Sequence, residues 1–289
     1  MPGGVEFIVR TNHYTEQDHH EHVPWRHKLL DAGEVLPSPL GGAVRACAPR
    51  PKEVLALVAT DLSTHGVAAV QLDEPFSDND FVEFGAGLGT ATEETDPAVQ
   101  PFVTDGVILN LLGKHHHTND VSLQPFAENS LSLHSEGSGR IAAEQPRYIV
   151  LMCCHPGDDP TSSQTVLISM ADVAARLSAQ QVKVLSRTRY AHLPAGETIV
   201  RLGTSQPVFS FRDFLGDRLD WINDEDDDPE TVNAAIGALL AAMYAPGAAG
   251  VHWRRGLMVV IDNTRHFHGR TAGLVSVRNP RHLKRLRIR

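Results

Sequence analysis

The sequence predicts a mainly β protein with packed helices and a double-stranded β-helix, or jelly-roll, core. Short apolar or alternating runs typical of strands recur along the chain, helical patterns are few and scattered, and no strand-helix rhythm marks a doubly wound sheet. No repeat or long linker divides it. We therefore expect one domain over 1–289, with an N-terminal arm and helices in 1–105 and a jelly-roll core in 106–289 that carries a helical insert near 171–245.

Helices are expected where start and stop signals frame an apolar pattern. Pro51 opens a helix that Gly66 ends, because proline suits a first helical turn and glycine suits the residue after the last. Residues 11–50, rich in His, Pro and Gly, predict an extended arm with short elements. Three further helices are expected at 78–88, 171–185 and 230–244.

Strands are expected where β-branched and apolar residues run or alternate between turn residues. In the basic C-terminal segment, Leu283, Leu286 and Ile288 alternate with Lys and Arg, which indicates a strand with some arginines pointing inward. The other expected strands span 67–72, 107–112, 130–135, 147–154, 164–169, 207–211 and 251–263.

Composition indicates a globular enzyme. The 289 residues are 42% hydrophobic and 21% charged, and the net charge of -9 argues against a nucleic-acid partner. No stretch approaches the roughly 18 apolar residues of a membrane span, and the N-terminal residues lack a signal-peptide pattern, so the cytoplasm is the expected location. Cys47, Cys153 and Cys154 have no metal-site spacing and are expected to be reduced thiols.

Three residues suggest a metal site. His134 and Glu136 follow the alternating run Leu131-Ser132-Leu133, and residues two apart on a strand point to the same side. His268 follows the apolar run 257–261 and is the expected third ligand. Two imidazoles and one carboxylate leave three positions open on an octahedral ion, the arrangement of non-heme Fe(II) oxygenases.

Other histidines compete for this role. His266 alternates with His268 and could face the same side, but the Gly269-Arg270 pair that follows favours His268. The remaining clusters are interpreted as solvated turns: His115, His116 and His117, and His19, His20 and His22.

Three segments carry a resemblance to a known family. The segment 261–272, with His268-Gly269-Arg270-Thr271 at its centre, resembles the distal-histidine motif of the clavaminate synthase-like, or taurine dioxygenase-like, Fe(II)/2-oxoglutarate oxygenases. Arg281-His282-Leu283-Lys284-Arg285 resembles that family's Arg-x-Leu-x-Arg strand, thirteen positions beyond His268. The segment 164–172 is similar to the family's strand that carries a cosubstrate-binding threonine.

The resemblance implies cofactors and roles. His134, Glu136 and His268 would hold Fe(II), with 2-oxoglutarate and dioxygen as cosubstrates. Arg281 would pair with the far carboxylate of 2-oxoglutarate, since a guanidinium binds both carboxylate oxygens at once, and Thr165 would add a hydroxyl. Arg285, on the same strand face, would take a substrate α-carboxylate.

Two features bear on the substrate. Glutamate rather than aspartate at position 136 favours the amino-acid-oxygenase branch of the family, whereas Gly273 stands where relatives usually carry an aromatic residue. The acidic run 224–228 has two interpretations. It is either a solvated loop before a helix or a lid whose Asp224 and Asp226 close over a basic substrate.

We therefore expect an enzyme that acts on an unactivated C–H bond of a free amino acid, with basic side chains as the first candidates, or of an amino-acid-derived small molecule, in specialised biosynthesis. Hydroxylation is the default outcome, with desaturation or oxidative ring closure as alternatives that use the same ligands. A non-catalytic jelly-roll binding protein is the alternative from another class, and the intact metal triad argues against it. A zinc hydrolase would lack a general base beside the metal residues.

Overall fold

The computed structural model describes residues 11–289 except 18, 40–42, 47–49, 114–116, 119, 121, 160, 203–205, 216, 217, 275 and 277. The predictions for Cys47, His115 and His116 thus lie outside the described residues. Within the described part of the chain, no helix combines the length and apolar character needed to cross a bilayer.

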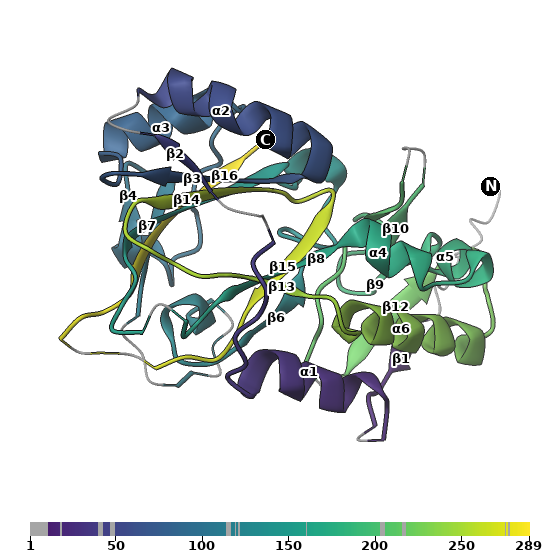
Figure 1. The fold of residues 1–289 in the computed structure, drawn as a ribbon. Helices are drawn as coiled ribbons and strands as arrows, with labels where there is room; N and C mark the ends of the chain where they lie inside the picture. The colour runs from purple at the N-terminus through teal and green to yellow at the C-terminus, as the bar shows by residue number, and fades with distance from the viewer. Residues whose placement is uncertain are drawn as a thin grey trace, which may run out of the picture.

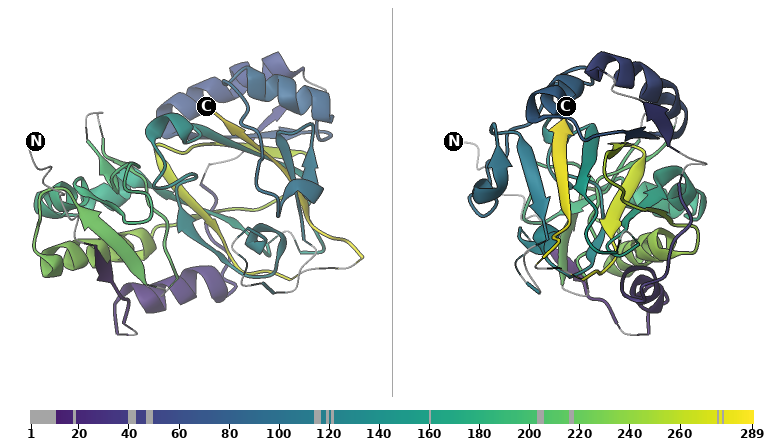
Figure 2. Two further views of the ribbon diagram at one scale, coloured as in Figure 1. Left: turned by 180° about the vertical axis from the view of Figure 1, so that it is seen from behind. Right: turned by 60° about the vertical axis from the view of Figure 1, so that its left-hand side comes forward.

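Two β-sheets face each other and form the core (Figures 1 and 2). All neighbours in them pair antiparallel except β2 and β3. The seven-stranded sheet runs β2 (Val44–Ala46), β3 (Val67–Leu72), β14 (Leu257–Asp262), β7 (Tyr148–His155), β16 (His282–Ile288), β5 (Ile108–Leu112) and β4 (Val103–Thr104). The four-stranded sheet runs β13 (Ala249–Val251), β8 (Thr165–Ser169), β15 (His266–Arg270) and β6 (Leu131–His134).

Helices cover the outer faces of both sheets. Figure 1 shows α2 (Pro51–His65) and α3 (Asp78–Ala86) over the seven-stranded sheet. The four-stranded sheet is covered by α6 (Pro229–Tyr244), whose apolar residues share a buried cluster with Leu133, Ile168 and Phe267. Around α6 lie α1 (His22–Asp31), α4 (Met170–Ala175) and α5 (Ala179–Leu185), and the small sheets β1 (Asn12–Tyr14)–β12 (Leu219–Asn223)–β9 (Thr188–Tyr190) and β10 (Val200–Arg201)–β11 (Val208–Phe209). Short 3-10 helices span Gln100–Phe102, Gln124–Phe126 and Ala142–Glu144.

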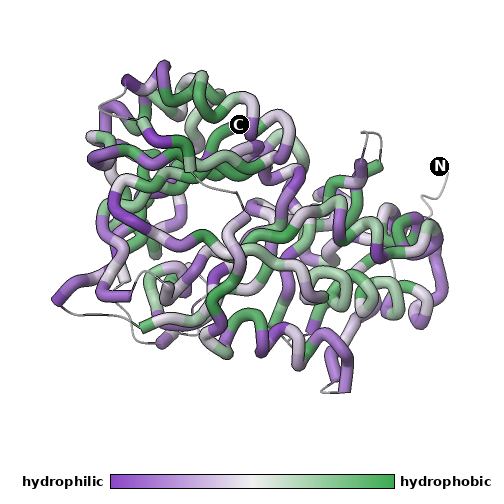
Figure 3. Tube along the Cα trace, in the orientation of Figure 1, coloured by the Kyte–Doolittle hydropathy of each residue, from purple (hydrophilic) through white to green (hydrophobic). Residues whose placement is uncertain are grey.

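Side-chain alternation decides what faces the space between the sheets. On β16, Leu286 and Ile288 pack into the apolar cluster beneath α2 and α3, whereas Leu283 packs into the cluster between the sheets. Because strand side chains alternate, Arg285 and Arg287 share the face of Leu283 and point between the sheets. Figure 3 shows the apolar residues gathered along the strands and the inner sides of the helices. The inward arginines expected from the C-terminal pattern are thus present.

Most expected elements form, with two informative differences. The helix expected over 171–185 is two helices, because Ser178 caps α5 by accepting a hydrogen bond from the Gln181 N–H at 3.2 Å. The strand expected over 251–263 is split into β13 and β14, which lie in different sheets. Between them Gly256 adopts a φ of +79°, a conformation that suits glycine and lets the chain turn.

Candidate metal centre

His134, Glu136 and His268 converge between the two sheets. His268 on β15 lies directly opposite His134 on β6 in the antiparallel register, and the two ring centroids are 4.4 Å apart. Glu136 follows β6, and its Oε2 lies 3.7 Å from Nε2 of each histidine. The three potential ligand atoms all lie within 4.8 Å of one another. His266 is outside this cluster, so the choice of His268 over His266 agrees with the geometry.

The histidine nitrogens that face the cluster are free to act as ligands. The Nδ1 of His134 lies 2.7 Å from the Ser132 carbonyl oxygen, which can only accept, so Nδ1 carries the proton and Nε2 keeps its lone pair. Burial, aided by the neighbouring His268, lowers the pKa of His134 to about 4, so the ring is neutral at physiological pH. A neutral imidazole is the form that binds a metal.

Glu136 supplies the charged donor. Burial alone would raise the pKa of its carboxyl group, but Arg285 and the two histidines outweigh burial and hold that pKa well below its usual range. Asn263, at the end of β14, fixes the Glu136 backbone: its Oδ1 accepts from the Glu136 N–H at 2.7 Å, and its Nδ2 donates to the Glu136 carbonyl at 3.0 Å and to Pro146 at 2.8 Å. No sequence pattern predicted this role for Asn263.

This donor set fits Fe(II). Two imidazoles and one carboxylate approach a common point from one side, which leaves room for further ligands on the other. Two of the three donors are supported by a neighbour: Ser132 orients the His134 ring, and Asn263 holds the backbone of Glu136.

The glycine and arginine that follow His268 keep β15 in place. A Cβ on Gly269 would lie 2.7 Å from the Leu131 carbonyl oxygen, so only glycine allows β15 to approach β6 this closely. Arg270 is buried and donates to the carbonyls of Gln124, Pro125, Ala127 and Asn129. Gly269 and Arg270 therefore keep His268 in position, and Arg270 also holds the adjacent 124–129 segment through its backbone carbonyls.

Thr165 and Arg281 lie in the same cavity between the sheets as the three metal residues. Thr165 accepts a hydrogen bond from the Trp253 indole N–H at 3.3 Å, and Arg281 donates to the Ser163 carbonyl at 3.1 Å. Burial lowers the pKa of Arg281 to about 10, and no carboxylate pairs with it in the described part of the chain. An enclosed guanidinium without a counter-ion is suited to receive an anionic ligand.

Arg285 is not free, because Glu94 holds it. The buried Glu94 carboxylate accepts from Arg285 at 2.9 Å through Oε1 and from Arg287 at 2.7 Å through Oε2. Both guanidinium groups also approach Oε1 of Glu136, at 3.5 Å for Arg285 and 3.4 Å for Arg287. Glu94 and Arg287 are site residues that sequence reasoning missed.

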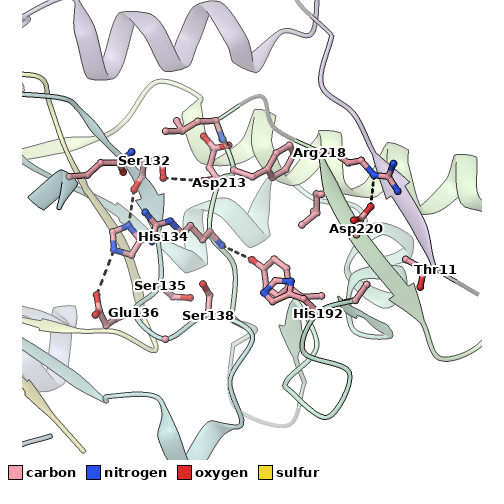
Figure 4. Close-up of a pocket in the computed structure, with 18 residues that line it drawn as sticks. Thr11, Ser132, His134, Ser135, Glu136, Ser138, His192, Asp213, Arg218 and Asp220 are labelled. Carbon is pink, nitrogen blue, oxygen red and sulfur yellow. Dashed lines mark hydrogen bonds and ion pairs between the residues drawn. The ribbon is translucent and has the colours of Figure 1, made fainter. Parts of the chain in front are cut away.

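Besides the cavity that holds Thr165 and Arg281, two larger cavities reach His134 and Glu136. The larger, about 1070 Å³, is lined by His134, Glu136 and polar residues from β9, β12 and the segment after β11 (Figure 4). The second, about 720 Å³, is lined by the same two metal residues and by Glu94, Arg285 and Arg287. Arg212 lines both cavities.

Asp224 and Asp226, the residues of the lid alternative, do not line the cavities at the metal residues. Asp224 forms an ion pair with Arg189, and neither Asp224 nor Asp226 lines a cavity that reaches the metal residues. They lie in the turn between β12 and α6, where Asp228 caps α6 by accepting from the Glu230 and Thr231 N–H groups at 3.1 Å. The run thus behaves as the solvated loop before a helix, and Asp220, four positions earlier than Asp224, is the acid of β12 that lines the larger cavity.

The sequence matches one family model, described as taurine catabolism dioxygenase TauD, TfdA family, over residues 46–287. A search of curated proteins gave no significant match.

Solved structures share the fold at low identity. PvcB from Pseudomonas aeruginosa is 19% identical with a TM-score of 0.61, and the match covers 88% of this chain and 90% of that one. Asparagine oxygenase in complex with Fe(II), 3-hydroxyasparagine and succinate is 16% identical with a TM-score of 0.59, covering 82% and 79%. The non-heme iron oxygenase OrfP in complex with Fe and α-ketoglutaric acid is 20% identical with a TM-score of 0.60, covering 82% and 79%. The jelly-roll prediction is confirmed.

Asn263→Asp tests the backbone support of Glu136. The variant keeps the acceptor for the Glu136 N–H but replaces the donor to Glu136 and Pro146 by a carboxylate oxygen that faces their carbonyls. We expect Fe(II) affinity to fall about 10- to 100-fold, as for losses of other groups that orient metal ligands. Anaerobic Fe(II) titration measures this, with the exposed Asn279→Asp as the matched control; equal affinities in both variants would contradict the role of Asn263.

Asp224→Ala and Asp226→Ala test the placement of the acidic run. Both side chains lie outside the cavities, so we expect kcat/KM for the best amino-acid substrate to stay within about twofold of the wild-type value, as for surface changes remote from a site. Steady-state succinate release measures it. A loss of turnover for basic substrates alone would restore the lid hypothesis.

Proposed function

The chain belongs to the TauD/TfdA family of Fe(II)/2-oxoglutarate-dependent dioxygenases, and from this premise we propose that it oxidises an unactivated C–H bond of a free amino acid or amino-acid-derived small molecule. Hydroxylation is the proposed outcome, in specialised biosynthesis and in the cytoplasm. Bound Fe(II) would activate dioxygen, which is the oxidant, and 2-oxoglutarate would supply two of the required electrons through its decarboxylation to succinate. The residues of this chain bind Fe(II) and 2-oxoglutarate and orient one C–H bond of the substrate toward the metal.

The proposal that the substrate is an amino acid rests on the pair formed by Arg285 and Glu94. A free amino acid presents a carboxylate and an ammonium group on one carbon, and the pair offers the two complementary charges beside Glu136. A planar guanidinium is suited to the carboxylate, and Glu94 to the ammonium. Both residues line the second cavity, so a substrate held there would lie next to the metal ligands.

Arg281 and Thr165 are the proposed anchors of 2-oxoglutarate. Arg281 has an enclosed charge and no carboxylate partner in the described residues, which suits the far carboxylate of the cosubstrate. The Thr165 hydroxyl, which already accepts from Trp253, can donate its proton to the same anion.

The similar structures support the substrate class. One is described as asparagine oxygenase with 3-hydroxyasparagine, and another as an OrfP variant with (3S)-hydroxy-L-Arg. Hydroxylation of the present substrate is therefore favoured over desaturation or ring closure, which would use the same ligands. A non-catalytic binding protein would have no need for the neutral, oriented imidazole of His134 beside an ionised carboxylate.

A substrate screen tests the proposed function. Succinate release is measured with the proteinogenic and common nonproteinogenic amino acids, and then with two analogues of the best one, its α-amide and its α-hydroxy acid. Each analogue lacks one of the groups that Arg285 and Glu94 would bind, so we expect kcat/KM to fall about 10- to 100-fold for either, the usual loss for an unpaired charged partner. If both analogues are turned over with the same kcat/KM as the parent amino acid, the proposal is contradicted.

Arg281→Lys and Arg285→Lys form a matched pair that separates the two arginine roles. Each variant keeps the positive charge and removes the planar fork. We expect Arg281→Lys to raise the KM for 2-oxoglutarate and Arg285→Lys to raise the KM for the amino acid, each by about 10-fold or more. Initial rates at varied concentrations of each substrate measure this, and the reverse pattern would mean that the roles are exchanged.

A further inference from the structure

Arg212 lies directly opposite the metal ligand His134. The segment after β11 runs antiparallel beside β6: Ser135 N–H donates to the Phe211 carbonyl at 2.9 Å, Asp213 N–H donates to the Leu133 carbonyl at 3.1 Å, and an isolated bridge pairs His134 with Arg212. Residues opposite each other in an antiparallel pair project their side chains to the same face. Arg212 therefore points to the side on which His134 faces the metal position.

Buried contacts on both sides of Arg212 hold this segment. The Tyr190 hydroxyl accepts from the Arg212 N–H at 2.9 Å. Next to it, the buried Asp213 carboxylate is paired with Arg26 at 2.7 Å and accepts from the Tyr244 hydroxyl at 2.6 Å. The Arg212 backbone is thus fixed by residues from α1, β9 and α6, so its side chain emerges from a rigid position.

The Arg212 guanidinium has no ion-pair or hydrogen-bond partner among the described residues, in contrast to Arg285 and Arg287. The carboxylates that line the larger cavity are all engaged: Asp213 with Arg26, Asp220 with Arg218 at 2.5 Å, and Glu136 in the metal cluster. Figure 4 shows Arg218 and Asp220 at the end of the cavity away from His134 and Glu136. Within the described residues, the charge next to the metal position that lacks a counter-ion is therefore positive.

We propose that the substrate carries a second carboxylate, on its side chain, and that Arg212 binds it across the metal cluster from Arg285. This rests on the proposed function, in which Arg285 and Glu94 take the α-carboxylate and ammonium groups. Arg285 lines the second cavity, and Arg212 lines both, so a dicarboxylic amino acid held at its two ends would lie over the metal position. The enzyme then selects an acidic amino acid over its amide, because the amide leaves Arg212 unpaired.

Acid and amide pairs test this selection. Succinate release is compared for aspartate and asparagine, glutamate and glutamine, and 2-aminoadipate and its amide. The three pairs place the side-chain carboxylate at different distances from the α-carbon, so that one of them can match the position of Arg212. We expect the wild-type enzyme to prefer the acid of its best pair by about 10-fold or more in kcat/KM. Arg212→Gln should lower kcat/KM for that acid about 10- to 100-fold and leave its amide within about twofold, whereas Arg212→Lys should keep part of the preference.

Arg218→Gln is the matched control, since it removes the same charge from the same cavity at a residue already paired with Asp220. We expect it to keep the preference for the acid, and an unchanged KM for 2-oxoglutarate in all variants shows that the metal centre is intact. A wild-type preference for amides or apolar amino acids, an equal loss for acid and amide in Arg212→Gln, or an equal effect of Arg218→Gln would overturn the inference. Absence of turnover with every amino acid would instead refute the proposed function itself.

Discussion

The pairing of β6 with β15 is the constraint on which the rest of the site depends. His134 and His268 stand opposite each other in that register, so their rings meet without any loop being needed to bring them together. A shift of one residue would turn one ring to the opposite face, toward the apolar cluster under α6. Gly269, close against the Leu131 carbonyl, and Arg270, with its four carbonyl acceptors, hold β15 in that register.

Charge between the sheets is the second organising feature. Glu94 and Glu136 balance Arg285 and Arg287, whereas Arg281 and Arg212 lack carboxylate partners within the described residues. Enclosing unpaired cations costs stability in a folded protein unless an anion arrives. In the proposed complex, the far carboxylate of 2-oxoglutarate would pair with Arg281 and a side-chain carboxylate of the substrate would pair with Arg212.

The sequence predicts a site residue when that residue lies in a recognisable local pattern, and it does not predict one whose role depends on distant contacts. His134, Glu136, His268, Thr165 and Arg281 lie in short motifs with fixed spacing and strand periodicity, so they could be identified, and the structure places them in one cavity. Glu94, Asn263 and Arg212 act through contacts with segments far away in the chain, which no local pattern reveals. The acidic run left two interpretations open, because a cluster of carboxylates before a helix looks the same in the sequence whether it caps the helix or closes a cavity.

The central claim is that His134, Glu136 and His268 hold one Fe(II) ion with open positions that 2-oxoglutarate can chelate. The most direct measurement is the visible absorption of the wild-type protein mixed anaerobically with Fe(II) and 2-oxoglutarate. We expect a weak charge-transfer band that needs both the metal and the keto acid, because a bidentate keto acid on ferrous iron produces it. Metal-loaded protein that shows no such band with saturating 2-oxoglutarate would contradict this coordination.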